Sequence, residues 1–523
     1  MSENRIGISE RIVFVAGLVL VLVCAAASFA DVKLPAIISD NMVIQQGMKV
    51  PIWGWAEPGE KVLISGSWQS RPWSATADKN GKWTVKIDPP RQAGGPYQMT
   101  ISAKNTVKIE NVLCGEVWVC SGQSNMQWSV ERTANAEQEI AAADYPKIRL
   151  FAVERNASGY PLDDCVGSWS GCSPETTAKF SAVAYFFGRE LHKELDVPIG
   201  LISTSWGGTR IEPWTPPAGF ASVAKLEEIR REVGQANGEY RKSVAESLDT
   251  IEGWVQGSRK ALTVNESIPA APIWPKHPLS SRGRPTGLYN AMVHSLVPFG
   301  IRGAIWYQGE SNRNDGMLYF EKMKALMGGW RSVWGQGDFP FYFVQLAPYH
   351  YGDEPLLLPR IWEAQKAALS VPNTGMAVTT DIGNLSDIHP KNKQDVGKRL
   401  ALWALAKTYG WGNLVYSGPL YKSMSVEANN VRVRFDHVGG GLASRDDKPL
   451  TWFTVAGADS NFVEADAKID GDTVMVWSDT IDEPVAVRFG WHQEAEPNLM
   501  NKEGLPASPF RTDNWPAITV NEK

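Results

Sequence analysis

The sequence predicts an α/β fold, a doubly wound parallel sheet with flanking antiparallel β accessory domains, and three patterns support this. Residues 31–109 alternate between apolar and polar side chains in short runs separated by Pro-Gly and Asn-Gly turns, which predicts a β-sandwich-like domain. Residues 110–409 alternate instead between apolar strand candidates and amphipathic helical stretches, as a parallel sheet requires. From 410 to 523 the β pattern returns, which predicts a C-terminal β-rich domain.

Residues 1–30 are predicted to be an export signal. Arg5 and Arg11 precede an apolar run at 12–27, and the Ser-Phe-Ala sequence at 28–30 offers small residues where a signal peptidase needs them. A retained N-terminal anchor is the alternative. No later segment is long and apolar enough to cross a bilayer, so we expect no stable membrane insertion after cleavage and a periplasmic or extracellular protein.

The composition excludes some partners. The net charge of −5 and a pI near 5.9 show no excess of basic residues of the kind that binds nucleic acid or anionic lipid. The unusual feature is the 22 tryptophans, most of which we expect in the core and a few of which suit the apolar faces of sugar rings. Cys165 and Cys172 flank a loop and either form a disulfide or stay free, as Cys114 and Cys120 would; the oligomeric state stays open.

The strand candidates of the central sheet follow one another in chain order, each separated by at least one helical stretch. They are "NVLCGEVWVC", "PIGLISTSW", "IRGAIWYQG", "FPFYFVQLA" and "GMAVTTDIG". A polar helical insertion at about 223–262 is predicted to lie outside the sheet. Farther along, "NNVRVRFDHV" and "DGDTVMVWSD" are strands of the C-terminal domain.

The polar residues that follow these strands converge on one edge, because functional crevices of open α/β sheets lie at the carboxyl ends of the strands. Ser124, in "CSGQSNMQ", follows the first strand. Taken alone, it is more simply explained as a serine that begins a helix. The presence of a base and of oxyanion donors after the other strands makes it a candidate nucleophile.

Among seven histidines, His389 is the best placed base, because it follows the last strand candidate and precedes a helix. Asp387, two residues earlier, is the predicted orienting acid, with Asp381 in reserve. Each carboxylate alone would more often be a loop residue or a helix cap.

The turns after the second and third strand candidates supply the predicted oxyanion hole. Gly207 and Gly208 in "SWGGT" allow backbone N–H groups to approach a substrate oxygen, and Gln308 in "YQGESN" offers an amide N–H. Glu310 is an orienting acid, a substrate ligand or a buried structural carboxylate, and the sequence does not separate these roles.

Other chemistries fit less well. Met126 stands where a G-x-S-x-G elbow has its second glycine, and the chain has no Walker loop, dinucleotide fingerprint or HExxH motif. A glycosidase using Glu310 and Asp387 is the main enzymatic rival, but it leaves Ser124 and His389 without a role. A secreted, non-catalytic carbohydrate-binding protein is the rival from another class.

At these residues the chain resembles a known family. The segments "VWVCSGQSNMQW", "FSAVAYFFGRELHKELDVPIG", "GLISTSWGGTRIEPW", "IWYQGESN" and "SDIHPKNKQDVGKRLA" resemble the sialate O-acetylesterase family, within the wider group of SGNH hydrolases. The resemblance covers about 110–406. Relative to the general SGNH pattern, Gln123 replaces an aspartate, "YQGE" replaces Gly-x-Asn-Asp, and Asp-x-His is one residue shorter than Asp-x-x-His.

The resemblance implies a serine esterase that removes O-acetyl groups from sugars through an acetyl-serine intermediate, without metal or cofactor. Ser124 would be the nucleophile and His389 the base, while Ser124 N–H, a glycine N–H from Gly207 or Gly208, and Gln308 would bind the oxyanion. The shorter Asp-x-His spacing makes Asp387 the weakest assignment. The natural substrate stays open between acetylated sialic acid and plant-wall polymers such as xylan or xyloglucan.

The same resemblance implies a set of substrate contacts around these groups. Arg210 would pair with a sialic acid carboxylate, although a structural contact with Glu212 is an equal alternative. The predicted substrate-binding residues are Asn125, Gln127, Arg210, Glu212, Trp214 and Glu310.

Overall fold

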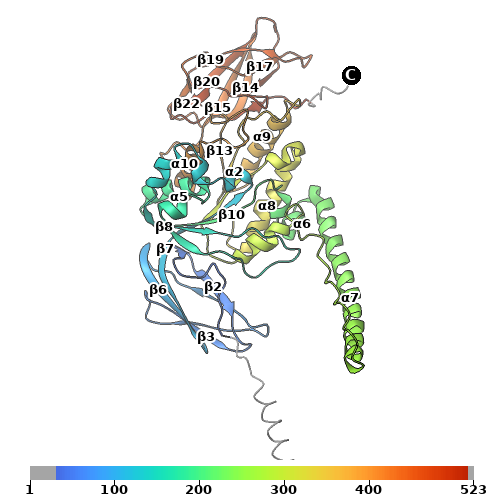
Figure 1. Cartoon of the computed structure of the whole chain (residues 1–523). Coiled ribbons are helices and arrows are strands. Elements are labelled where there is room, and N and C mark those ends of the chain that lie inside the picture. The colour runs from blue at the N-terminus through green and yellow to red at the C-terminus, as the bar shows by residue number, and fades with distance from the viewer. Residues whose placement is uncertain (1–30, 516–523) are drawn as a thin grey trace, which may run out of the picture.

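The computed structural model describes residues 31–515, so the predicted export signal at 1–30 lies outside the described residues. A mixed α/β layer forms the middle of the molecule (Figure 1). The strands of its central sheet lie in the order β13 (Thr374–Ala377), β12 (Phe341–Val344), β11 (Gly303–Tyr307), β7 (Thr106–Gly122), β10 (Ile199–Ser205), β8 (Tyr145–Ala152) and β9 (Trp169–Cys172).

Neighbouring strands from β13 to β8 are parallel, and β9 is an antiparallel edge strand. The parallel arrangement predicted for the five apolar segments is therefore confirmed. The sequence did not indicate β8 or β9. In β8, Pro146, Lys147 and Arg149 interrupt the apolar run that marks a strand buried on both faces.

Helices cover both sides of the sheet, with α5 (Ala182–Leu195) and α10 (Lys393–Trp403) on one side and α6 (Pro217–Ala221), α8 (Leu318–Trp334) and α9 (Leu357–Ala367) on the other (Figure 1). Side-chain caps set their starts: the Ser181 hydroxyl accepts a hydrogen bond from Ala184 N–H, and the Asn392 side chain accepts one from Asp395 N–H. Asp196 ends α5 in the left-handed conformation, with φ of 49°.

Shorter helices lie in the connections. They are α2 (Ser124–Gln127), α3 (Ala136–Ala141), α4 (Pro174–Thr177), the 3₁₀ turns η1 (Val130–Arg132), η2 (Glu212–Trp214), η3 (Ala224–Leu226), η5 (His294–Leu296), η6 (Glu310–Asp315) and η7 (Ala368–Ser370), and the π-helical turns η4 (Tyr289–Val293) and η8 (Ala404–Thr408).

The N-terminal β region is continuous with the central sheet, because β7 is a single strand of 17 residues. Its first half pairs with β6 and its second half with β10 and β11, so the predicted boundary at 109/110 falls inside a strand. One apolar core runs through both regions. The other strands here are β1 (Val43–Gln45), β2 (Val50–Trp55), β3 (Lys61–Gly66), β4 (Trp73–Thr76), β5 (Lys82–Ile87) and β6 (Gly94–Ser102).

The long helix α7 (Glu227–Thr263) projects from the side of the molecule (Figure 1). It has 37 residues and lies in the stretch where the sequence indicates helix. Its buried side chains are confined to the parts near its two ends, namely Val233, Ala236, Ser258 and Ala261. The middle of α7 therefore contributes no packing to the central sheet.

Antiparallel sheets with an apolar core of their own form the C-terminal region. Its strands are β14 (Leu420–Glu427), β15 (Asn430–Asp436), β16 (Leu442–Ser444), β17 (Phe453–Ala456), β18 (Val463–Glu464), β19 (Asp466–Asp470), β20 (Thr473–Trp477), β21 (Ala486–Phe489), β22 (Leu499–Asn501) and β23 (Phe510–Arg511).

All cysteines of the described chain are free thiols, so the alternative of a Cys165–Cys172 disulfide is wrong. Burial raises the pKa of the Cys165 thiol to about 11. Between residues 31 and 515, none of the helices has both the length and the apolar character needed to cross a membrane.

Candidate active site

The carboxyl ends of three parallel strands meet at one edge of the sheet. Gly122 at the end of β7 lies opposite Ser205 of β10 on one side and Tyr307 of β11 on the other. Strands β10 and β8 extend the sheet from one side of β7, and β11 to β13 extend it from the other. The chain thus reverses its direction of winding at β7, and such a switch point is where open α/β sheets form binding crevices.

The turn after β7 carries Ser124 and is held by both neighbouring strands. Gly122 has φ of +146°, and a Cβ there would lie 2.1 Å from the Tyr307 carbonyl oxygen, so only glycine fits. Gln123 N–H donates to the same carbonyl at 3.0 Å. Ser124 begins α2 and is half-buried. Its position is therefore set by backbone contacts at the sheet edge.

The turn after β10 brings Gly207 against Ser124. Trp206 N–H donates to Gly122 O at 3.1 Å, and a Cβ on Gly207 would lie 3.3 Å from the Ser124 Cβ. Gly207 N–H already donates to Gln127 Oε1 at 2.7 Å. Gly208 is exposed, with φ of +71°, and its N–H has no acceptor among residues 31–515. Of the two glycines, Gly208 is the one whose N–H stays available to a ligand.

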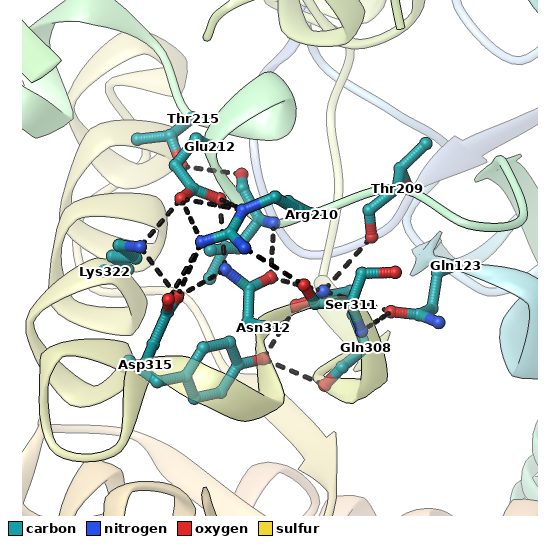
Figure 2. A network of polar contacts seen from close by, with 12 residues as sticks. Gln123, Thr209, Arg210, Glu212, Thr215, Gln308, Ser311, Asn312, Asp315 and Lys322 are labelled. Carbon is teal, nitrogen blue, oxygen red and sulfur yellow. Dashed lines mark hydrogen bonds and ion pairs between the residues drawn. The ribbon is translucent and has the colours of Figure 1, made fainter. Parts of the chain in front are cut away.

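Gln308 does not fit the oxyanion role that the sequence suggested. Its side chain is completely buried. The amide nitrogen donates to Gln123 Oε1 at 3.1 Å and Asn312 Oδ1 at 2.7 Å, and the amide oxygen accepts from the Tyr319 hydroxyl at 2.9 Å. Figure 2 shows Gln308 inside this polar network. Its amide holds the turn after β11 against the turn after β7, and no N–H of this amide remains for a substrate.

Arg210 and Glu212 belong to the same network (Figure 2). The Arg210 guanidinium donates to both oxygens of Asp315 at 2.9 and 3.0 Å and to Glu212 at 3.0 Å. The buried Lys322 ammonium donates to both carboxylates at 2.7 Å. Burial by itself raises the pKa of Glu212, but Lys322 and Arg210 outweigh it and lower the pKa to about 2.

Of the two roles considered for Arg210, the structure shows the contact with Glu212, and 41% of the Arg210 side chain stays exposed. Its contact with Glu212 is structural, and Glu212 is almost enclosed. Trp214 is fully buried, and its indole N–H donates to the Thr209 hydroxyl at 3.0 Å. Trp214 has no exposed surface and Glu212 only 8%, so the structure gives both side chains internal partners in place of the predicted substrate contact. Both brace the turn that carries Gly207 and Gly208.

The loop after β13 carries the predicted acid and base. Asp387 Oδ1 accepts from His389 N–H at 2.9 Å and lies 3.6 Å from His389 Nδ1. Asp381, the reserve acid, is bound instead by two Arg399 nitrogens, each at 2.6 Å. Of the two aspartates, only Asp387 adjoins the imidazole.

The His389 ring stacks on Trp128, with ring centroids 4.8 Å apart. The Arg132 guanidinium lies over the same indole, 3.6 Å from its centroid. Burial lowers the pKa of His389, the positive charges of Lys393 and Arg132 lower it further, and the Asp387 carboxylate only partly opposes them. The imidazole is thus kept neutral near neutral pH, as a general base must be.

Asn125 joins the nucleophile turn to the histidine loop. Its side-chain nitrogen donates to Ile388 O at 3.0 Å and to Glu310 Oε1 at 2.5 Å, while its oxygen accepts from Lys393 Nζ at 2.6 Å. Asn125 follows Ser124 and Ile388 precedes His389, so this hydrogen bond brings the two loops together. The side chains of Asn125 and Glu310 thus have internal partners in place of the predicted substrate contact.

Sequence reasoning missed several residues that surround this site. Trp128, Arg132 and Lys393 all border His389, and the half-buried Trp206 lies beside the exposed Arg155, whose guanidinium is 5.9 Å from the indole ring. Trp128 and Trp206 had a usable signal, because each lies within four residues of Ser124 or next to Gly207. Lys393 had none, because a lysine in the first turn of a helix is ordinarily exposed.

A serine at a strand end, an adjacent exposed backbone N–H and a histidine with a lowered pKa are the kinds of group that acyl transfer requires. Within the described part of the chain, no group of three or more His, Cys, Asp or Glu side chains is arranged to hold a metal ion.

Comparisons with known proteins show which family the chain belongs to. The family model for carbohydrate esterases, described as sialic acid-specific acetylesterase, matches residues 114–267 and 273–406. The sialate O-acetylesterase of Mus musculus is 32% identical over 459 residues, covering 79% of this chain and 81% of that protein. That of Homo sapiens is 32% identical over 458 residues, covering 79% of each.

A solved structure extends the similarity to nearly the whole molecule. The crystal structure of a carbohydrate acetylesterase from Xanthomonas citri has a TM-score of 0.78 and 35% identity, covering 93% of this chain and 100% of that one. These similarities do not favour a glycosidase or a non-catalytic carbohydrate-binding protein. The chain belongs to the sialate O-acetylesterase family and is a carbohydrate O-acetylesterase.

Proposed function

We propose that this protein is an exported serine esterase with an SGNH-hydrolase-like catalytic domain, and that it removes O-acetyl groups from sugars through an acetyl-serine intermediate. The observation that carries this proposal is the hydrogen bond from Asn125 to Ile388 O, which ties the Ser124 turn to the His389 loop. A nucleophile and a base on loops joined in this way have no purpose in a protein that only binds carbohydrate.

The mechanism has two half-reactions. The Ser124 hydroxyl oxygen attacks the acetyl carbonyl carbon while His389 takes the hydroxyl proton. The tetrahedral intermediate then expels the sugar oxygen, which receives that proton from His389. Water next attacks the acetyl-serine, again losing a proton to His389, and acetate leaves as Ser124 recovers its proton.

Backbone N–H groups bind the oxyanion in this mechanism. In the turn after β10 the donor is Gly208 N–H, because Gly207 N–H already donates to Gln127. In the turn after β7 the donor is Ser124 N–H. Gln308 acts only by holding these turns in place. Asp387 orients His389 by accepting from its backbone N–H and by facing its ring.

The substrate is an acetylated sugar that contacts aromatic and cationic side chains around the Ser124 site. Trp206 offers a ring for stacking next to Gly208, and the exposed Arg132 and Arg155 suit a sugar with a carboxylate. The mammalian relatives are named for sialate and the bacterial structure for carbohydrate in general. We therefore propose acetylated sialic acid and acetylated plant-wall polymers, such as xylan or xyloglucan, as the two substrate classes to compare.

Acetate release tests the proposal. Wild-type protein, Ser124→Ala, His389→Ala and a control, Ser70→Ala at an exposed serine of the N-terminal region, are assayed on 4-nitrophenyl acetate, acetylated xylan and O-acetyl sialic acid. We expect release by the wild type and the control only. Undiminished activity of Ser124→Ala would contradict the nucleophile assignment, and the preferred natural ester would identify the substrate.

Export is tested separately by fractionating cells and sequencing the N-terminus of the mature protein. We expect the mature chain to begin at Asp31, as the residues at 28–30 predict. An uncleaved chain in the cytoplasm would contradict this part of the proposal and leave the esterase mechanism untouched.

A further inference from the structure

A lysine ammonium lies beneath the candidate active site. Lys393 is the first residue of α10, and only 1% of its surface is exposed. It shares the core-facing side of the helix with Val396, Gly397 and Leu400. An apolar side chain would fill this position without the cost of enclosing a charge. Stability alone therefore gives no reason for a lysine here.

The ammonium is directed at one acceptor next to the nucleophile. Lys393 Nζ donates to Asn125 Oδ1 at 2.6 Å. Because this bond fixes Oδ1 as the acceptor, the amide nitrogen of Asn125 must point the other way, toward Glu310 Oε1 and Ile388 O. The lysine thus sets the orientation of the amide that joins the two catalytic loops.

Three loops meet at this amide. Asn125 comes from the end of β7, Glu310 from the end of β11, and Ile388 and Lys393 from the segment after β13. The turn after β10 is attached separately, through Gly207 N–H and Gln127. Removing the Lys393 contact frees the amide to rotate and so loosens the connection between the Ser124 turn and the His389 loop.

The charges around Lys393 also bear on the base. Lys393 faces the Glu310 and Asp387 carboxylates, and its ammonium lies 5.9 Å from the Trp128 ring and 5.4 Å from the Tyr307 ring. Burial lowers the pKa of Lys393 to about 7 and raises that of Glu310. Glu310 Oε2 is buried with no hydrogen-bond partner in the described chain. Asn125 stands between the two groups, so they form a bridged pair and not a direct structural ion pair.

We propose that Lys393 is a positioning residue of the esterase. It orients the Asn125 amide and thereby keeps the Ser124 turn and the His389 loop in a fixed position relative to each other. This inference rests on the proposed function. Its second consequence concerns His389, whose charged neighbours are Lys393, Arg132 and Asp387. In the acid range Lys393 is protonated, and its charge opposes protonation of the imidazole.

The test compares Lys393→Met with Lys398→Met, a control at an exposed lysine of the same helix. Rates on 4-nitrophenyl acetate are measured from pH 4.5 to 9, with folding checked by circular dichroism. For Lys393→Met we expect kcat to fall at least tenfold with little change in KM. We also expect the acid limb of the kcat/KM profile to move to higher pH, because His389 loses a repelling charge. The limb reports the lost charge, and the fall in kcat at unchanged KM is the readout that a merely structural lysine would not give.

A folded Lys393→Met protein with a wild-type kcat and an unmoved acid limb overturns the proposal. If Lys393→Met does not fold, Asn125→Asp decides, because it keeps the acceptor for Lys393 and removes the donor to Ile388 O. A tenfold lower kcat at unchanged KM then supports the proposal, and a wild-type kcat overturns it. Ser124→Ala is measured in parallel: if it stays active, the proposed function fails, whereas an inactive Ser124→Ala beside an active Lys393→Met rejects only the positioning role.

Discussion

The imidazole of His389 lies flat against the indole of Trp128, with ring centroids 4.8 Å apart and ring planes inclined by only 16°. Trp128 is buried, and its indole N–H donates to Arg132 O at 2.9 Å, so the indole itself has a fixed orientation. The stack therefore holds the His389 ring in one plane before any substrate binds. For the base that we propose His389 to be, such preorganisation contributes more to the rate than to stability.

Replacing Trp128 separates these two effects. Trp128→Ala removes a buried aromatic side chain and should lower the free energy of unfolding by about 3 kcal/mol. It should also lower kcat at least tenfold, because the His389 ring is released. Trp128→Phe keeps a stacking surface and should retain most of the rate. Urea denaturation and kcat on 4-nitrophenyl acetate measure the two quantities, with Trp411→Ala at an exposed tryptophan as the control. Equal kcat for the two Trp128 variants would contradict the role of the stack.

The pH profile distinguishes Asp387 from Asp381. The pKa of His389 is lowered by burial and by Lys393 and Arg132, so the acid limb of kcat/KM should lie below pH 6.5, the ordinary pKa of a histidine. Asp387 acts in the opposite direction, so Asp387→Asn should lower the pKa of His389 and move the limb to still lower pH. The rate at pH 7 should also fall, because the ring loses its orienting carboxylate.

Asp381→Asn is the matched control for that experiment. Its carboxylate is bound by Arg399, so we expect lower stability and an unmoved acid limb. A limb that moves in Asp381→Asn and not in Asp387→Asn would reassign the orienting acid. It would also require the loop after β13 to rearrange when substrate binds.

Five strands of the central sheet could be predicted from sequence because they are buried on both faces. The apolar segments that became β7, β10, β11, β12 and β13 were all visible as continuous runs. The convergence of Ser124, Gly207 and Gln308 at one edge followed from the rule for parallel strands. The register of the strands could not be predicted. It places Gly122 opposite both Ser205 and Tyr307 and so decides which residues of adjacent strands are in contact.

The roles of individual polar residues were harder to predict, because a polar side chain after a strand either faces the crevice or holds the turn. Arg210 and Glu212 were predicted to contact the substrate and Gln308 to bind the oxyanion, and each has at least one internal partner that lies about 100 positions away in the chain or more. Lys322 and Lys393 are the partners that the sequence concealed, since both lie on helices where lysine is normally exposed. Burial, which depends on tertiary packing, was the missing information.

The pH dependence of stability should report the Glu212 ion pairs. The folded-state pKa of Glu212 is about 2 against an ordinary 4.5, which corresponds to about 3 kcal/mol of stabilisation. Because the folded pKa is depressed, this contribution is complete above pH 4.5 and is lost as the pH falls toward 2. Glu212→Gln lacks it, so the difference in unfolding free energy between wild type and variant should shrink by about 2 kcal/mol between pH 7 and pH 3.

Urea denaturation at pH 7, 5 and 3 measures that difference. The control is Glu246→Gln, at a carboxylate on the projecting helix α7 with 66% of its side chain exposed. Its difference from wild type should stay constant over the same range. A constant difference for Glu212→Gln as well would mean that Lys322 and Arg210 do not hold this carboxylate ionised.

The two glycines of the second turn should respond differently to the same substitution. A Cβ on Gly207 would lie 3.2 Å from Gln127 Oε1 and 3.3 Å from the Ser124 Cβ, so Gly207→Ala must displace one of them. We expect kcat to fall about tenfold, since a small displacement of a nucleophile has effects of this size or larger.

A Cβ on Gly208 meets no atom within 4 Å, but its φ of +71° disfavours any L-residue by about 1–2 kcal/mol. Gly208→Ala should therefore lose stability while keeping its N–H and, at low temperature, most of its kcat. Both variants are compared by kcat at 15 °C and by thermal denaturation, and a wild-type kcat for Gly207→Ala would show that Ser124 does not sit against this turn during the reaction.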